Sequence, residues 1–213
     1  MPWPPDTRMV AVDVSRAMIR GVWPGAALGH VAVCARWTAM PLAGGTEHVV
    51  IGDGCFSALT GDAYQAMARS LRALLRPDGL ALMRFFIRPE RPETPAIVFG
   101  DLEAGQIGNF HVFKWRLAMA VHGALADGVR LADIWDAWHA AVPRPEILAR
   151  NRGWPLPVIS TIDDFRGVDA RYTFPTLAEA RSAMAEGFEE IACHFPSYEL
   201  GERCPILAFR PRE

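Results

Sequence analysis

The chain has 213 residues, of which 51% are hydrophobic and 22% are charged, a composition typical of a folded protein with a sizeable core. Its formal net charge of −2 argues against electrostatic capture of nucleic acid or of anionic lipid. Charges or turn residues interrupt every apolar run well short of the ~18 residues that cross a bilayer, so no membrane span is expected.

The cysteines and the N-terminus indicate the cellular compartment. The four cysteines form no CxxC pair and show no zinc-ligand spacing, so we expect reduced thiols and no metal site. The segment Met1–Asp6 has neither a basic region nor an apolar core, which is unlike a secretory signal. A cytoplasmic protein is therefore expected.

The first apolar run is followed by a helix signal. Met9–Val12 is a short apolar run that ends in Asp13, which suits a buried parallel strand. Ser15 could cap a helix that begins near Arg16. This helix would place three apolar side chains on its inner face, namely Met18, Ile19 and Val22.

Three further strands and an amphipathic helix are predicted before residue 88. His30–Cys34 and His48–Gly52 are typical of strands, and the second run leads into Asp53 and Gly54. A helix follows and ends before Pro77, which forbids its continuation, and a fourth strand is expected over Leu80–Ile87. The apolar face of the helix recurs at intervals of three and four, at Ala63, Met67, Leu71, Leu74 and Leu75.

This order of strands and helices predicts an α/β fold with a mostly parallel sheet. Residues 88–175 break the rhythm with prolines, tryptophans and helical patterns near 110–125 and 131–141, so we expect an inserted cap within one domain of residues 1–213. Thr176, with Glu179 three residues later, indicates a capping box. The segments 188–195 and 204–210 then suit an antiparallel strand pair at one edge of the sheet.

Three motifs in this order resemble those of the class I S-adenosylmethionine (SAM) dependent methyltransferases. They are Val10–Met18, Val49–Gly54 and Leu74–Gly79, and with the terminal strand pair the resemblance covers roughly residues 8–87 and 176–210. It implies a Rossmann-like sheet, SAM as cofactor, and methyl transfer to an acceptor. The near-neutral charge favours a small-molecule acceptor over nucleic acid.

The resemblance also assigns roles to individual residues. Asp13 would accept hydrogen bonds from the two ribose hydroxyls of SAM, although such an acid also suits the ribose of NAD or the N-terminus of a helix. Met18 would pack near the adenine, or belong to the core. Asp53 would lie near the methionine end of SAM or near the acceptor, and Gly54 would let backbone approach a ligand closely.

Two departures from the family pattern concern the adenine site and the first strand. Arg36 stands where many members have an acid, and it cannot replace that contact because adenine N6 and arginine are both donors; Trp37 could stack on the adenine or pack in the core. The family's first strand and glycine-rich turn need about thirty residues, but only eight precede Met9. The first strand is therefore expected to be absent, which leaves neighbouring strands with unpaired backbone groups. A partner edge in a homo-oligomer could compensate.

The predicted cap offers candidates for an acceptor pocket. A histidine there could act as a general base, but nothing selects His111 over His139. Arg84 and Arg88, near the end of the fourth strand, could also reach the acceptor. Tryptophans at helical spacing belong more often to a core than to a ligand platform. The polar and aromatic cap set comprises His111, Lys114, Trp115, Trp135, Trp138, His139 and Tyr172.

Three functions remain open at this point. The first is SAM-dependent methyl transfer to a small molecule. The second is a non-catalytic relative, a binding or scaffold protein that has lost SAM, which the missing glycine loop and Arg36 favour. The third is an NAD-dependent oxidoreductase, which shares the acid at the end of the strand but also needs the glycine turn.

Overall fold

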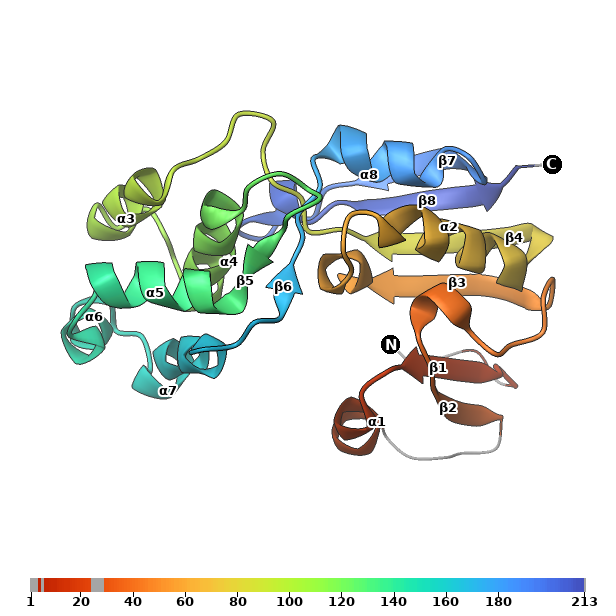
Figure 1. The fold of residues 1–213 in the computed structure, drawn as a ribbon, viewed down its shortest axis with the longest axis horizontal. Helices are drawn as coiled ribbons and strands as arrows, with labels where there is room; N and C mark the ends of the chain where they lie inside the picture. Colours follow the sequence, from red (N-terminus) through yellow and green to blue (C-terminus); the bar gives the residue numbers. More distant parts are fainter. Residues whose placement is uncertain (1–3, 5, 24–28, 213) are drawn as a thin grey trace.

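The computed structural model describes residues 4, 6–23 and 29–212, and part of the segment before Met9 lies outside them. The strands form two main sheets (Figure 1). A two-stranded parallel sheet pairs β1 with β2, and a four-stranded sheet has the order β3-β4-β8-β7. The strands are β1 (Met9–Asp13), β2 (His30–Cys34), β3 (Glu47–Asp53), β4 (Leu75–Arg84), β7 (Phe188–His194) and β8 (Ile206–Pro211).

The predicted α/β fold is confirmed, and the prediction of a mostly parallel sheet is confirmed in part, since the β1-β2 and β3-β4 pairs are parallel. Within the four-stranded sheet only β3 and β4 are parallel, whereas β8 pairs antiparallel with both β4 and β7. The reason is that the predicted terminal strand pair, which is confirmed, inserts its last strand next to β4. That insertion adds two antiparallel ladders to a sheet with one parallel ladder.

The described residues place no strand between β1 and β3, so the facing edges of both strands lack a ladder partner. Asp13 bonds toward β2 through its carbonyl, which accepts from Ala35 N–H (3.1 Å). Because backbone groups alternate between the two edges of a parallel strand, those of Val10 and Val12 face the other edge. The Val12 carbonyl there accepts from the indole Nε1–H of Trp37 (2.6 Å). On β3, Ile51 is 56% exposed.

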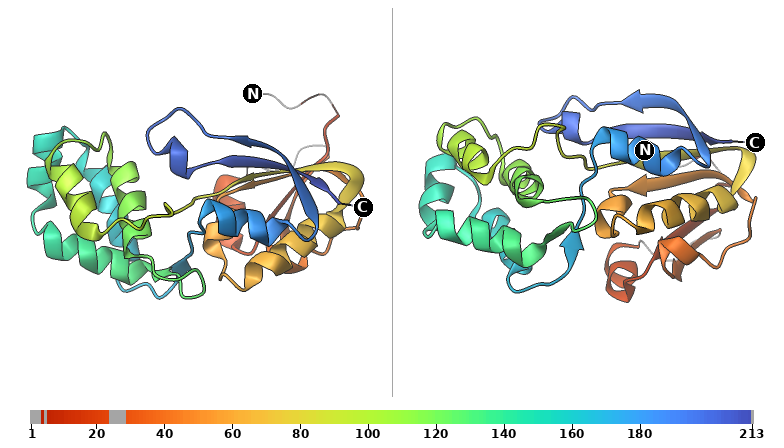
Figure 2. Two further views of the ribbon diagram at one scale, coloured as in Figure 1. Left: turned by 90° about the horizontal axis from the view of Figure 1, so that it is seen from above. Right: turned by 45° about the horizontal axis from the view of Figure 1, so that its top comes forward.

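Two helices cover one face of the four-stranded sheet, as Figure 2 shows: α2 (Ala63–Leu74) and α8 (Leu177–Met184). Ala81, Met83 and Phe85 of the β4 segment are fully buried beneath them, since alternate residues of a strand face the same side. The predicted apolar face of α2 is confirmed by the burial of Met67, Leu71 and Leu74, but Leu75 is already the first residue of β4, which begins before the predicted Leu80 and ends at Arg84. Both bonds of the predicted capping box at the start of α8 are present.

Residues 88–175 form a helical group with its own apolar core, beside the end of the sheet (Figure 1). The predicted helices near 110–125 and 131–141 are confirmed, the first ending at Val121. Three shorter helices and a strand pair were not predicted, because segments of this length carry little periodicity. The elements are α3 (Pro95–Glu103), α4 (Phe110–Val121), β5 (Val129–Arg130), α5 (Leu131–Ala141), α6 (Pro145–Arg152), α7 (Leu156–Ile159) and β6 (Arg171–Tyr172).

Helix α1 (Arg16–Val22) begins as predicted, with the Ser15 hydroxyl accepting from the Met18 N–H (3.2 Å). The predicted inner face is wrong: Met18 is 50% exposed, Val22 is 68% exposed, and no residue of α1 is buried. The helix lies beside the small β1-β2 sheet, which offers too little surface to cover it.

Short 3-10 turns complete the described chain, at η1 (Trp37–Ala39), η2 (Cys55–Ala58), η3 (Ser160–Phe165) and η4 (Gly201–Arg203). All four cysteines are free thiols. None of the helices within the described ranges has the length and apolarity that a bilayer crossing requires.

Candidate functional site

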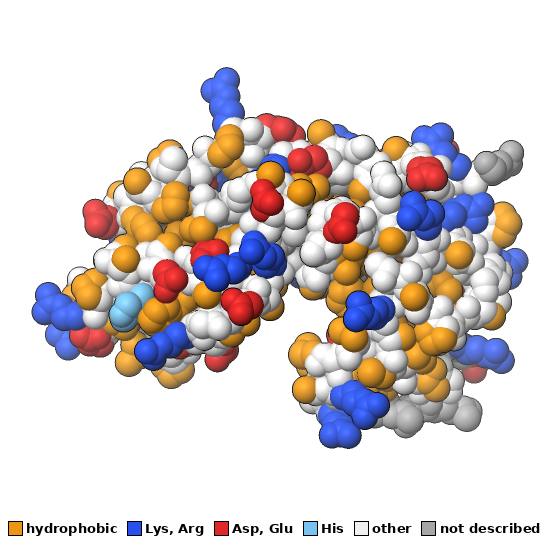
Figure 3. All heavy atoms as spheres, in the orientation of Figure 1, with side chains coloured by type: hydrophobic (Ala, Val, Ile, Leu, Met, Phe, Trp, Pro, Cys, Tyr) orange, Lys and Arg blue, Asp and Glu red, His pale blue; other side chains and the backbone are white. Residues whose placement is uncertain are grey.

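The two acids predicted as ligand contacts end strands that point the same way. In Figure 1, β1 and β3 both run toward the side on which residues 88–175 lie. Asp13 is the last residue of β1, and Asp53 is the last residue of β3. The space-filling view shows a hollow between the helical group and the small N-terminal sheet (Figure 3). Ligands of open α/β sheets bind at the carboxyl ends of strands, so this side is the candidate site.

Asp13 retains an oxygen for a ligand. Its side chain is half-buried, and its Oδ1 accepts a hydrogen bond from the Ser15 N–H (2.6 Å). This local bond fixes the carboxylate at the N-terminus of α1, as the alternative interpretation of a helix N-terminal charge requires. Its Oδ2 has no hydrogen-bond partner among the described residues. A carboxylate held at one oxygen can still accept from a hydroxyl at the other.

Asp53 is part of an ion pair rather than a free acid. Arg84, at the end of neighbouring β4, donates from Nε to Oδ1 (2.5 Å) and from Nη2 to Oδ2 (2.8 Å) of Asp53. The same guanidinium donates to the hydroxyl of Tyr198 (3.2 Å). This bidentate geometry is the strongest arrangement of a guanidinium and a carboxylate. The two strand ends thus present a fixed pair of opposite charges.

Gly54 is required by the backbone and by an aromatic neighbour. Its φ is 64°, in the left-handed region, and a Cβ at this position would lie 2.5 Å from Cε2 of Phe86. Phe86 in turn stacks on Trp115 of α4, with ring centroids 4.6 Å apart. The guanidinium of Arg84 lies 5.5 Å from the centroid of the Phe86 ring. Gly54 therefore allows the end of β3 to pack directly against Phe86, whose ring contacts Trp115 in the helical group of residues 88–175.

The residues predicted near the adenine lie in different surroundings and do not form one group. Trp37 is half-buried, packs against the core of the four-stranded sheet, and donates to β1, which agrees with its alternative as a core residue. Met18 lies on the exposed face of α1, so its alternative as a core residue is wrong. Arg36 is exposed, and no ion pair joins it to another described residue.

The residues of the cap that were predicted to form an acceptor pocket lie in several separate places. His111 and His139 are both exposed, and the ring of His139 stacks on that of Trp135 (4.5 Å). Trp138 is a core residue, as expected for a tryptophan at helical spacing. Lys114 donates to Thr161 (3.1 Å). Of the set, Trp115 contacts the strand ends through Phe86, and Tyr172 contacts Trp115 (5.4 Å). Lys114 joins the same group of contacts through Phe165.

Tyr198 and Phe86 are the site residues that sequence reasoning missed. Tyr198 lies in the connection between β7 and β8, a region without a motif, and reaches Arg84 only in three dimensions. Phe86 follows Arg84 by two positions, so its place on the same side of the extended chain could have been found from the alternation of side chains. A cavity of about 450 Å³ adjoins Tyr198 and lies between the α3–α4 region and residues 197–203.

A buried histidine lies between the cap and the sheet but outside this group. His122 accepts at Nε2 from the N–H of Phe174 (3.1 Å), and its Nδ1 has no partner among the described residues. Burial, together with the nearby charge of Arg88, holds the pKa of His122 below its ordinary value. A neutral imidazole that accepts a backbone bond is a structural contact between the end of α4 and the segment that returns to the sheet.

Comparisons with known proteins now add to this geometry. No family model and no curated protein matches the chain. Solved structures do match. A Listeria monocytogenes protein provisionally described as a SAM-dependent methyltransferase aligns with a TM-score of 0.52 and 11% identity, over 97% of this chain and 81% of that one. The chain has the fold of the class I SAM-dependent methyltransferases.

Two further structures have similar scores. The Burkholderia thailandensis 1,6-didemethyltoxoflavin-N1-methyltransferase, solved with S-adenosylhomocysteine bound, aligns with a TM-score of 0.51 and 13% identity, over 97% of this chain and 62% of that one. A Rhodobacter sphaeroides protein provisionally described as a Zn-dependent alcohol dehydrogenase aligns with a TM-score of 0.56 and 11% identity, over 97% and 76%. At these identities the methyltransferase-like fold is what the likeness establishes.

Proposed function

We propose that the protein is a SAM-dependent methyltransferase that acts on a small-molecule acceptor. The observation that carries the proposal is the placement of Asp13, with one free oxygen, and of the Asp53–Arg84 pair at the ends of strands that point the same way. The methyltransferase-like fold supports it, because ligands of such sheets lie at this side. The cavity beside Tyr198, about 450 Å³, has a volume typical of small-molecule sites.

The polar groups present fit both ends of SAM. Asp13 Oδ2 is a charged acceptor suited to a ribose hydroxyl. The methionine end of SAM is a zwitterion, and the Asp53–Arg84 pair offers one group of each charge. A carboxylate has about four lone-pair sites and a guanidinium has five N–H donors, so both groups can bind a ligand without losing their mutual bonds.

In this proposal the chain's residues align the reactants and exclude water. SAM, when bound, would supply a methyl group on a sulfonium sulfur, and in-line attack of the acceptor on the methyl carbon would break the C–S bond and release S-adenosylhomocysteine. Asp13 would fix the ribose, and Asp53 with Arg84 would orient the amino-acid end. Trp115, stacked on Phe86, would close the side of the site that faces the cap. Alignment and exclusion of water are the main contributions a protein makes to such a displacement.

Calorimetric titration of the folded protein with S-adenosylhomocysteine tests the proposal. Binding is expected, and Asp13→Asn should weaken it by about tenfold or more, because a charge-assisted hydrogen bond contributes about 1.5–3 kcal/mol. Asp78→Asn is the control, since Asp78 is exposed and lies in the first half of β4, toward the end opposite to Arg84. Absence of heat with the folded wild-type protein, or equal affinity of Asp13→Asn, would contradict the proposal.

A further inference from the structure

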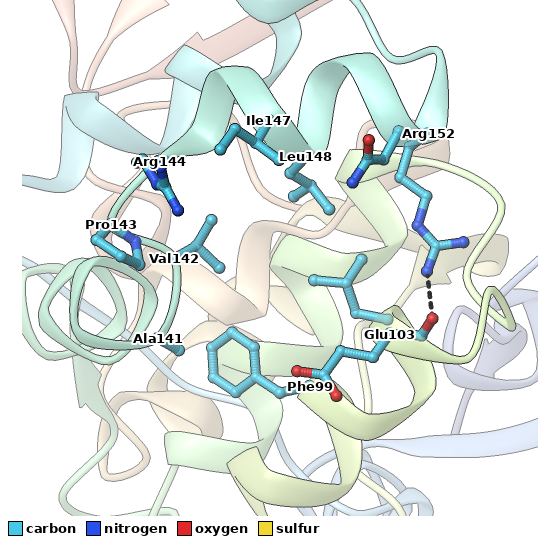
Figure 4. A pocket seen from close by; sticks show the side chains of 11 residues that line it. Phe99, Glu103, Ala141, Val142, Pro143, Arg144, Ile147, Leu148 and Arg152 are labelled. Carbon is cyan, nitrogen blue, oxygen red and sulfur yellow. Dashed lines mark hydrogen bonds between the residues drawn. The ribbon is translucent and has the colours of Figure 1, made fainter.

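A second cavity lies in the cap, remote from the strand ends. It has a volume of about 490 Å³ and is bounded by α3, by the end of α5 and by α6 (Figure 4). Its volume falls in the range of small-molecule sites. The apolar part of its wall is formed by Phe99, Leu102, Val142, Ile147 and Leu148. None of the residues discussed for the methyltransferase site lines it.

Two opposite charges project into this cavity from different helices. Glu103 is the last residue of α3, and Arg144 precedes the first turn of α6. Figure 4 shows the guanidinium of Arg144 and the carboxylate of Glu103 directed toward the cavity from opposite walls. Neither side chain forms an ion pair or a hydrogen bond with another side chain in the described part of the molecule. Apolar side chains lie between them.

The neighbouring cation, Arg152, is already held by backbone. It donates from Nη2 to the carbonyl oxygen of Glu103 (3.0 Å). Its Nη1 lies against Gly105, where a Cβ would be 2.8 Å away, and this glycine has a φ of +79°. Arg152 is thus part of the wall, and the close approach fixes the end of α3 relative to α6. This contact keeps Glu103 and Arg144 on facing sides of the cavity.

We propose that this cavity binds a small zwitterion with an apolar body, of the class of free apolar amino acids. The ligand carboxylate would bind Arg144, its ammonium group would bind Glu103, and its apolar body would lie on Phe99 and Leu148. A purely anionic ligand would place its charge near Glu103, and a purely cationic one would face two guanidinium groups. Glu103 and Arg144 are exposed in the free protein, and a zwitterion that covers them would pair each charge as it is removed from water.

Titration monitored by amide chemical shifts, with L-leucine as the probe, tests the proposal. Leucine should shift the amides of residues 99–105 and 142–152. Two matched analogues separate the charges: 4-methylpentanoate lacks the ammonium group, and 3-methylbutylamine lacks the carboxylate. Each should bind about tenfold more weakly than leucine, since each leaves one protein charge without a partner. Equal binding of either analogue would overturn the proposal, as would the absence of leucine-induced shifts at millimolar concentration.

Three substitutions assign the contacts. Arg144→Gln and Glu103→Gln should each weaken leucine binding by about tenfold. Arg150→Gln is the control, because Arg150 is an exposed arginine of the same helix that does not line the cavity, and it should leave the affinity within about twofold. All three positions are exposed, so an unchanged Tm will show that folding is intact. Unaltered affinity of Arg144→Gln would contradict the assigned geometry.

Discussion

Replacing Gly54 with alanine is expected to lower the free energy of unfolding by about 2–5 kcal/mol. Two physical costs add at this position. The backbone has a φ of 64°, which costs an L-residue about 1–2 kcal/mol. The new Cβ would also lie 2.5 Å from the ring of Phe86, and relief of such a clash within packed side chains costs about 1–3 kcal/mol. Denaturant unfolding measures the sum.

A second glycine separates these two costs. Gly45 has a similar φ of 66°, but nothing lies within 4 Å of its Cβ position. Gly45→Ala should therefore cost only the backbone part, about 1–2 kcal/mol. In a protein that already carries Phe86→Ala, the ring that clashes with the new Cβ is gone. Gly54→Ala should therefore lower the free energy of unfolding of that variant only by the backbone part. Equal destabilisation by Gly45→Ala and Gly54→Ala would show that the contact between β3 and Phe86 is not tight.

Glu93→Gln is the second substitution with a large expected effect, a loss of about 2–3 kcal/mol. Glu93 accepts from Arg116 of α4 (2.7 Å) and from Arg203 of η4 (2.8 Å), and the three side chains are 12–17% exposed. The group therefore joins the cap to the connection between β7 and β8. A neutral amide keeps the shape but leaves two largely buried guanidinium groups with one fewer charge to pair with.

The same group predicts a dependence of stability on pH. Burial alone would raise the pKa of Glu93, but the guanidinium groups of Arg203 and Arg116 outweigh it and hold the pKa below its ordinary value of 4.5. The contribution to stability is therefore present above that value and is lost as the pH falls through the lowered pKa. Glu93→Gln should remove this part of the acid sensitivity. Glu189→Gln, at an exposed residue without an ion pair among the described residues, should change stability by less than about 0.5 kcal/mol.

The sequence predicted those elements whose signals are local. The capping box at Thr176, the apolar face of α2 and the alternating strand pair at the C-terminus each follow from spacing within one element. The pairing of β8 with β4 has no local signal, because it joins residues 81–84 to 206–209. The exposure of Met18 was missed for a similar reason: helical spacing identifies an apolar face but does not show whether a neighbour covers it.

The candidate site was predicted in part. Asp13 and Asp53 could be found because each ends an apolar run, and the fold places both at the same side. Arg84 was noted only as a residue that could reach the acceptor, and its ion pair with Asp53 depends on the register of β3 and β4. The contact of Tyr198 with Arg84 spans 114 positions in sequence, a separation that no motif encodes. The role of these residues in binding stays a prediction.

The most direct test of the proposed site is a map of amide chemical shifts as S-adenosylhomocysteine is added to the folded protein. The account predicts that the amides near Asp13 and Ser15 shift together with those of Asp53 and Gly54, with one common dissociation constant, because one ligand would span both strand ends. Shifts at only one of these two places, or shifts confined to the helices of the cap, would contradict a shared nucleoside site.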